Sequence, residues 1–447
     1  MILMLGGLCD RPFCVHRGNI KKGLTRSAEY DNFIGNVFHF RRFFNKEESK
    51  MQRKETWLKF RHKLVLWVLR PFFEPYIRWK YKINIEEFKE QGDRPFLIIM
   101  NHQTAFDQFF VCAMFNRPIY FVASEDIFSL GFWSDALRYL VGPIPIKKQT
   151  LDLQAVKNCI KVAREGGSIA LAPEGNRTYH GRTVYMKPGI ASLVKKLGMP
   201  LAIFRIDGGY GIHPRWSDVV RRGKMRCYIS RVIEPEEYAN MSGEELFEII
   251  KQELWADEGK ITGEFHHKKN AEFLERAMYV CPWCGLSTFE SHDDIISCTK
   301  CGRQIRHKPT KELEGVGFEF PHRFVADWYD YQNEFVNQTD LTALTEVPVY
   351  EETVQLRKVN PYKNKKLLNK AAKICLYGDR ITVDDRVFSF DETSAVVVLG
   401  KNKLNIYADK ELLQMKGSKR FNALKYVNFF HRYKNIKEGK NNEFLGL

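Results

Sequence analysis

Between about residue 95 and residue 237 the sequence alternates short apolar runs with longer amphipathic stretches, and this alternation limits the possible folds more than any other feature. The apolar runs predict strands over 96–100, 119–123, 168–172, 201–204 and 225–230. Apolar residues recur with helical spacing over 132–141, 151–164, 189–197 and 243–254. Strands that alternate with helices are typical of α/β domains, so we expect a mixed sheet with flanking helices over residues 91–275.

Residues 1–90 differ from the predicted α/β region in periodicity and composition. Residues 1–50 show little periodicity and predict a poorly structured extension. From Trp57 to Tyr81, Trp, Phe and Leu are mixed with Lys and Arg, as in interfacial helices, and Pro71 with Pro75 should divide this run into two pieces. No stretch reaches the roughly 18 to 20 apolar residues of a spanning helix. We expect residues 51–90 to be an amphipathic helical segment that contacts a membrane; a helical hairpin packed in the core is an alternative that stays open.

The overall charge favours an anionic partner. The formal net charge is +16, which suits nucleic acid, a phospholipid surface or phosphorylated substrates. Aromatic residues make up 13% of the chain, and this favours the membrane, because interfacial binding needs large apolar side chains as well as cations. Four of the ten cysteines form metal-type pairs, which indicates a reducing compartment. We therefore expect a peripheral protein on the cytoplasmic face of the cell membrane.

A histidine and an aspartate follow the first strand of the predicted α/β domain, in the segment NHQTAFD. In a regular helix, residues five apart are separated by about 140° around the axis. His102 should therefore lie in the turn before the helix and reach across to Asp107. A histidine oriented by a carboxylate through one ring nitrogen can take a proton from a hydroxyl with the other, which is general-base catalysis without a protein nucleophile. A helix-capping histidine with an incidental aspartate is the structural alternative.

Charged residues follow two more strand-like segments. Glu174, Gly175 and Arg177 stand just after the run 168–172, at a second strand end, where α/β proteins build their sites. The guanidinium of Arg177 could bind a phosphate through paired hydrogen bonds. In GPIPIKK, Lys147 and Lys148 could also meet a phosphate.

Taken in order, NHQTAFD, GPIPIKK, APEGNRT and GMPLAIF resemble the four sequence blocks of the 1-acylglycerol-3-phosphate acyltransferase family. The resemblance implies that His102 is the general base and Asp107 its partner, and that Glu174, Gly175 and Arg177 bind the glycerol phosphate. It further implies an acyl donor, acyl-CoA or acyl-carrier protein, and a lysophospholipid acceptor, with phosphatidic acid as the product. Lys148 stands where the family usually has an arginine, so a different lysophospholipid or alcohol remains an alternative acceptor.

Two C-x2-C pairs, each followed by a glycine and separated by 13 residues, place Cys281 and Cys284 before Cys298 and Cys301. Four thiolates in this spacing predict a structural zinc ribbon over residues 276–310. Because zinc ribbons also occur in nucleic-acid proteins, a basic module that binds nucleic acid or a protein is the rival function. Acidic residues lie inside the ribbon, namely Glu290, Asp293 and Asp294, so no nucleic acid is expected as a partner.

The last part of the chain, residues 311–447, is rich in strand-like segments and ends in one amphipathic helix over 421–436. This order predicts a small β-barrel-like domain closed by a helix. The segment GKNKLNIYA and the helix after it weakly resemble a pleckstrin-homology domain, which would suit docking to lipid or to a partner.

Overall fold

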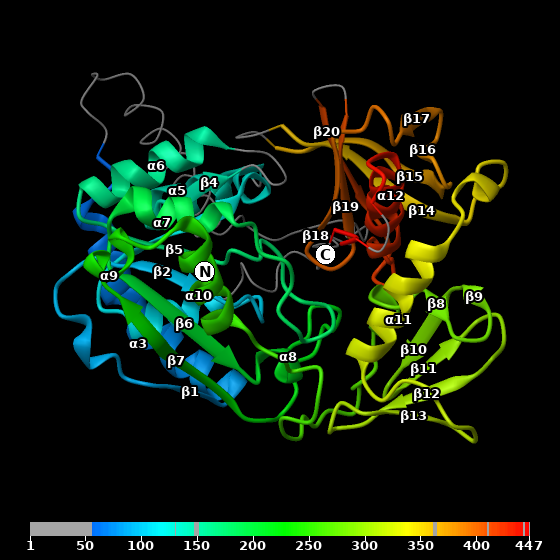
Figure 1. Ribbon diagram of the computed structural model, residues 1–447, viewed down its shortest axis with the longest axis horizontal. Helices are drawn as coiled ribbons and strands as arrows, with labels where there is room; N and C mark the ends of the chain where they lie inside the picture. The colour runs from blue at the N-terminus through cyan, green and yellow to red at the C-terminus, as the bar shows by residue number, and fades with distance from the viewer. Residues whose placement is uncertain are drawn as a thin grey trace, which may run out of the picture. The chain divides into compact units, whose positions relative to one another are not determined.

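The computed structural model describes residues 56–129, 131–146, 152–360, 364–408, 411–440 and 443–446 (Figure 1). The predicted N-terminal extension therefore lies outside the described residues. The chain from Leu58 onward forms one compact unit, in which the α/β region, the cysteine-containing region and the C-terminal sheet contact one another.

The α/β region is built on one seven-stranded sheet in the order β1-β7-β6-β2-β5-β3-β4. All strands from β6 to β4 in this order run parallel, whereas β7 runs antiparallel to β6 and carries β1 beside it. The bounds are β1 Ile83–Ile85, β2 Leu97–Met100, β3 Ile119–Ser124, β4 Ile144–Ile146, β5 Ser168–Leu171, β6 Leu201–Asp207 and β7 Met225–Ile233. The predicted mixed sheet is confirmed, and the short strands β1 and β4 are additions to it.

Helices cover both faces of this sheet. On one face, α3 and α4 pack Phe73 and Phe110 against Ile98 and Phe204. On the other, α6, α7 and α10 contact one another and strands β4, β5 and β6, over fully buried residues such as Leu97. The helices are α3 Phe60–Tyr81, α4 Asp107–Met114, α5 Phe132–Val141, α6 Leu153–Arg164, α7 Gly189–Leu197, α8 Gly209–Ile212, α9 Pro235–Ala239 and α10 Gly243–Leu254, with 3-10 turns η1 Lys89–Gln91 and η2 Glu125–Ser129.

Helix α3 is continuous, so the predicted division at Pro71 and Pro75 is wrong. Both prolines lie on the exposed side of the helix, while Phe73 and Ile77 on the opposite side are buried in the core. An internal proline costs a helix about 3 kcal/mol, and burial of large apolar side chains contributes comparable amounts, so packing holds the helix together. Within the residues that the structure describes, no helix is long and apolar enough to cross a membrane.

The cysteine-containing region follows η3 (Leu274–Arg276) and consists of short antiparallel strands and one helix. The strands are β8 Val280–Cys281, β9 Gly285–Leu286, β10 Phe289–His292, β11 Ile295–Cys298, β12 Gln304–His307 and β13 Leu313–Gly315. Helix α11 (Val325–Gln338) packs on them, since Trp328 donates to the Val280 carbonyl and Gln332 accepts from the amide of Tyr279.

The C-terminal sheet has seven antiparallel strands in the order β17-β16-β15-β14-β20-β19-β18. It curls into a half-barrel with β17 and β18 as its two edges, and α12 packs against β18. The bounds are β14 Tyr350–Lys358, β15 Lys366–Leu376, β16 Arg380–Val383, β17 Arg386–Ser389, β18 Ala395–Leu399, β19 Lys403–Ala408, β20 Glu411–Lys416 and α12 Leu424–Lys437, after the turn η4 Thr342–Leu344. The predicted fold class is confirmed; the domain boundaries and the pleckstrin-homology likeness stay predictions.

Candidate active site

His102 lies in the loop between β2 and α4, where it meets the first residue of the helix. Its ring nitrogen Nδ1 lies 2.8 Å from Oδ2 of Asp107. The structure therefore brings the two predicted residues together, with the histidine outside the helix as the spacing requires. Their catalytic roles stay a prediction.

The Asp107 carboxylate is held by more than the histidine. It accepts hydrogen bonds from the backbone amides of Gln103 and Thr104, both at 2.8 Å, and from the Thr104 hydroxyl at 2.7 Å. Its side chain has no solvent exposure, whereas the His102 side chain is 28% exposed. A buried carboxylate with this many donors cannot turn away without leaving polar groups unpaired, so the orientation of His102 is fixed from the protein side.

Glu174 connects the loop after β5 to the loop after β2. One carboxyl oxygen accepts the backbone N–H of His102 at 2.9 Å, and the other accepts the N–H of Val184 at 3.4 Å. Burial raises the pKa of the Glu174 carboxyl to about 8; the two N–H donors lower it, and the charge of Asp107 raises it. At neutral pH this carboxyl is therefore largely protonated, and it positions the main chain at His102.

Gly175 follows Glu174 with φ +67°, in the left-handed region that favours glycine, and the chain turns sharply there. Its N–H donates to the carbonyl of Ala172 at 3.1 Å. This amide therefore closes a turn, and a transition-state oxyanion would need other donors.

Arg177 lies in the loop after β5, two residues beyond Gly175, and its Nη1 atom is buried with no hydrogen-bond partner. Burial lowers the pKa of its guanidinium to about 10; Arg215 also lowers it, and Asp107 raises it. A buried donor without a partner costs free energy, because it has lost its hydrogen bonds to water. A ligand that accepts a hydrogen bond from Nη1 would remove this cost. Lys147 and Lys148, the other predicted phosphate ligands, lie outside the described residues.

Two neighbours of the site were not predicted. The side chain of Asn101 donates to the Ile206 carbonyl and accepts from its amide, so it joins the ends of β2 and β6 beside His102. The hydroxyl of Tyr81, at the end of α3, lies 3.3 Å from Nδ1 of His213. The pKa of His213 is well below its usual value, mainly because the ring is buried, and the charges of Lys401 and Arg177 add to the effect. Asn101 is the first residue of NHQTAFD, but that segment indicates roles only for His102 and Asp107, and Tyr81 belongs to no pattern that points to catalysis.

The four predicted metal ligands come together in the cysteine-containing region. The Sγ atoms of Cys281, Cys284, Cys298 and Cys301 all lie within 4.8 Å of one another. Those of Cys281 and Cys301 are 3.9 Å apart, close to the edge of about 3.8 Å in a tetrahedron with Zn–S bonds of about 2.3 Å. The donor set can hold a metal ion.

Comparison with known proteins bears on the α/β region. Residues 80–206 match the family model described as Acyltransferase. The chain is 26% identical over 158 residues to the chloroplastic 1-acyl-sn-glycerol-3-phosphate acyltransferase LPAT1 of Arabidopsis thaliana, a match that covers 34% of this chain and 44% of that protein. It is 25% identical to the chloroplastic 1-acyl-sn-glycerol-3-phosphate acyltransferase BAT2 of Brassica napus, over 34% of this chain and 45% of that protein.

This chain therefore spans less than half the length of the curated relatives it matches. The solved structure of the 1-acyl-sn-glycerophosphate (LPA) acyltransferase PlsC from Thermotoga maritima is 22% identical and aligns with 50% of this chain and 89% of that chain, at a TM-score of 0.38. The family match and the two sequence relatives show that the α/β region of this chain is similar to acyltransferases, among them 1-acyl-sn-glycerol-3-phosphate acyltransferases.

Proposed function

We propose that this protein is a glycerolipid O-acyltransferase that moves a fatty acyl group from acyl-CoA or acyl-carrier protein to the free hydroxyl of 1-acylglycerol-3-phosphate, giving phosphatidic acid. The observation that carries the proposal is the bond between His102 and the buried Asp107, at the carboxyl end of a parallel strand. The activity in the names of the two plant relatives supports it.

In this reaction the His102 ring donates its Nδ1–H to Asp107, and Nε2 accepts the proton of the acceptor hydroxyl. The hydroxyl oxygen attacks the thioester carbonyl, and a tetrahedral oxyanion forms. When it collapses, the C–S bond breaks, and the leaving thiolate takes the proton from the imidazolium. No covalent enzyme intermediate is needed, because the histidine acts only on the proton.

The acceptor phosphate is assigned to Arg177, whose buried Nη1 needs a hydrogen-bond acceptor. Glu174 and Gly175 shape the loop that carries it, and Lys148 is a second phosphate ligand on sequence grounds. An arginine binds phosphate through two parallel N–H donors, which gives direction as well as charge.

The exposed face of α3, opposite the side that packs in the core, supports attachment to an anionic membrane surface. Large apolar side chains repeat along this face at helical spacing and remain exposed: Phe60, Leu64, Trp67, Phe72 and Trp79, of which Trp67 is 75% and Trp79 77% exposed. Lysines and arginines flank them in the sequence. This is the composition of a helix that lies in a lipid interface, and we assign the protein to the cytoplasmic face of the cell membrane as a peripheral enzyme.

We assign the ion of the four-cysteine cluster as zinc in a structural role. The ligands would be the thiolates of Cys281, Cys284, Cys298 and Cys301, and four sulfur ligands leave no open position for a substrate.

The decisive experiment measures transfer of radiolabelled acyl groups to lysophosphatidic acid by the wild type and by His102→Ala. General acid–base catalysis contributes about 10²- to 10⁴-fold, so the variant should lose that much of kcat. His266→Ala is the matched control, because His266 also contacts a carboxylate at 2.8 Å, that of Glu264, but on the exposed surface. Equal activity of His102→Ala and wild type would refute the mechanism.

A further inference from the structure

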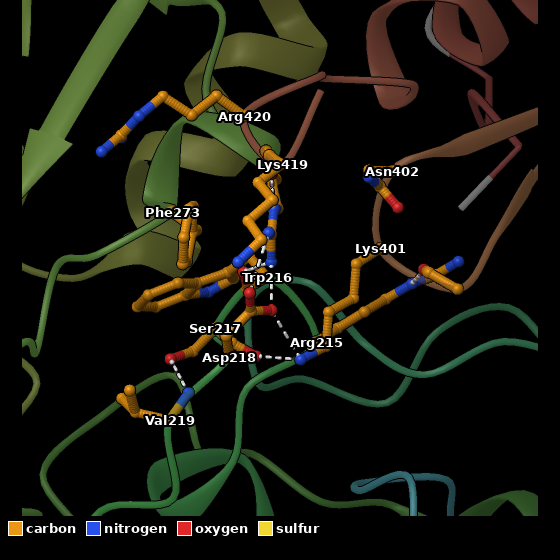
Figure 2. Close-up of polar contacts among 12 residues, drawn as sticks. Arg215, Trp216, Ser217, Asp218, Val219, Phe273, Lys401, Asn402, Lys419 and Arg420 are labelled. Carbon is orange, nitrogen blue, oxygen red and sulfur yellow. Dashed lines mark hydrogen bonds and ion pairs between the residues drawn. The ribbon is translucent and has the colours of Figure 1, made fainter. Parts of the chain in front are cut away.

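The segment from His213 to Ser217, which follows α8, is buried although it contains three polar or charged side chains, and Asp218 follows it. Cations from later in the chain hold it. Lys401 donates to the Ser217 carbonyl at 2.6 Å and to Asp218 at 2.8 Å, and Figure 2 shows its side chain reaching Asp218 from the C-terminal sheet. Arg276 donates to the Trp216 carbonyl at 2.8 Å and to both oxygens of Asp218.

Arg215 lies at the centre of this segment and connects it to two other parts of the molecule. Its Nη1 donates to the backbone carbonyl of Arg177 at 2.9 Å. Its Nε and Nη2 donate to the carbonyls of Gly400 and Val398, at 3.3 and 3.4 Å. Arg215 is 2% exposed. Its guanidinium carbon lies 4.4 Å from the centre of the Tyr179 ring, on which it stacks. One guanidinium thus joins the loop of the α/β region that carries Arg177 to the C-terminal sheet.

The sheet presents these carbonyls through a sharp turn between β18 and β19. Leu399 pairs with Lys403, and the chain reverses over Gly400, Lys401 and Asn402. Gly400 has φ +63°, which favours glycine, and the Asn402 side chain anchors the turn to the Gly417 and Ser418 carbonyls. The turn is therefore held in place by contacts within its own part of the chain, independently of Arg215. It is the GKNK segment of the sequence.

Positive charge is in excess where these parts meet. Arg177, Arg215, Arg276 and Lys401 converge there. Asp218 binds Arg276 and Lys401, and the charge of Asp107 acts on Arg177. Burial lowers the pKa of Lys401 to about 8; Asp218 raises it, while Arg177 and Arg276 lower it further. Such an arrangement is stabilised by an anion, and the buried Nη1 of Arg177 is a charged donor there without a hydrogen-bond partner, as are the neutral Trp216 Nε1 and the Tyr179 hydroxyl.

We propose that the C-terminal sheet is part of the acceptor site: Arg215, anchored on the β18–β19 turn, is a positioning residue that sets Arg177 against the phosphate of the acceptor lipid. The inference rests on the proposed function, because it takes lysophosphatidic acid as the acceptor. It gives the C-terminal sheet a role in substrate specificity that a simple docking module would not have.

The test compares two acceptors with the same acyl chain, lysophosphatidic acid and monoacylglycerol, which lacks the phosphate. Arg215→Gln should raise KM for lysophosphatidic acid about tenfold or more, while KM for the acyl donor and transfer to monoacylglycerol stay within about twofold. Arg177→Gln should do the same, and the double variant should be no worse than Arg177→Gln, because Arg215 acts through Arg177. Arg215→Lys, which keeps the charge but not the three donors, should recover only part of the preference.

Arg420→Gln is the matched control. Arg420 also joins the C-terminal part to earlier residues, through Glu272 and Glu275, and does not contact Arg177. It should reduce stability and keep the acceptor preference. If Arg215→Gln does not fold, Arg215→Lys carries the same comparison. The inference is overturned if Arg215 variants keep the wild-type preference or slow both acceptors equally. Wild-type protein that transfers to neither acceptor contradicts the proposed function, and this is seen before any variant is made.

Discussion

Asp107 and His102 lie five positions apart and are joined by a 2.8 Å hydrogen bond, with the carboxylate fully buried and the ring reaching solvent. Asp107→Asn should keep the shape of the loop but can place an amide N–H toward Nδ1 of His102, which itself donates to the wild-type carboxylate. We expect kcat to fall about 10²- to 10⁴-fold with KM for both substrates nearly unchanged, because the ring loses its orientation. Steady-state kinetics with lysophosphatidic acid and an acyl thioester measure this.

Asp107→Asn should also lose about 1–3 kcal/mol of unfolding free energy, since buried donors at Gln103 and Thr104 lose a charged acceptor. Urea denaturation separates this loss from the kinetic one. A variant that is less stable yet retains wild-type kcat would show that the pair is structural.

Glu174 should make the stability of the protein depend on pH. Its folded pKa, about 8, is above the ordinary value of 4.5, because the carboxyl is buried. The stabilisation is therefore complete below about pH 4.5 and is lost as the pH rises toward 8, by at most about 1.4 kcal/mol per pH unit. Glu174→Gln mimics the neutral acid and lacks this loss.

The measurement is urea unfolding of both proteins between pH 5 and pH 8.5. The free energy of the wild type relative to Glu174→Gln should decrease across this range, and the comparison removes the other titrating groups. Two curves that stay parallel would mean that Glu174 ionises normally in the folded protein.

The sequence predicts the α/β region well, because its central strands are buried on both faces and appear as continuous apolar runs. Strands β1 and β4 have three residues each, too few for a pattern, and β4 contains Pro145. Local rules for proline predict two pieces for α3, because they ignore the packing of Phe73 and Ile77 that keeps the helix continuous.

In the candidate site, too, some contacts can be predicted from the sequence and others cannot. His102 and Asp107 are near each other in the sequence, so spacing alone could predict their contact. Asn101 binds the backbone of a residue 105 positions away, and Arg215 binds carbonyls 183 and 185 positions away. Backbone carbonyls carry no sequence signal, so these contacts become visible only when the fold brings the segments together.

The exposed face of α3 gives a prediction about lipid binding. The double variant Trp67→Ser with Phe72→Ser should bind vesicles that contain anionic lipid at least about tenfold more weakly, because burying each aromatic side chain contributes about 1.5–3 kcal/mol. These side chains are 75% and 72% exposed, so the stability of the protein in solution should hardly change. Vesicle flotation at increasing salt measures the binding, which should weaken as charges are screened.

Trp255→Ser is the control for that experiment, since Trp255 is another exposed tryptophan, at 51%, but follows α10. It should float like the wild type. Equal flotation of the α3 double variant and the wild type would place the lipid contact elsewhere on the molecule.

The four-cysteine cluster gives the last prediction. Purified protein should contain about one equivalent of zinc, and Cys281→Ser should lose it, because a tetrahedral site needs all four thiolates. Cys281 is buried in the same core as Trp328 and Val280, so loss of the ion should lower the unfolding temperature as well. Cys112→Ser, outside the cluster, should keep both the metal and most of the stability. Metal analysis and thermal unfolding with and without a chelator test this, and a protein that melts at the same temperature with and without its metal would remove the structural role.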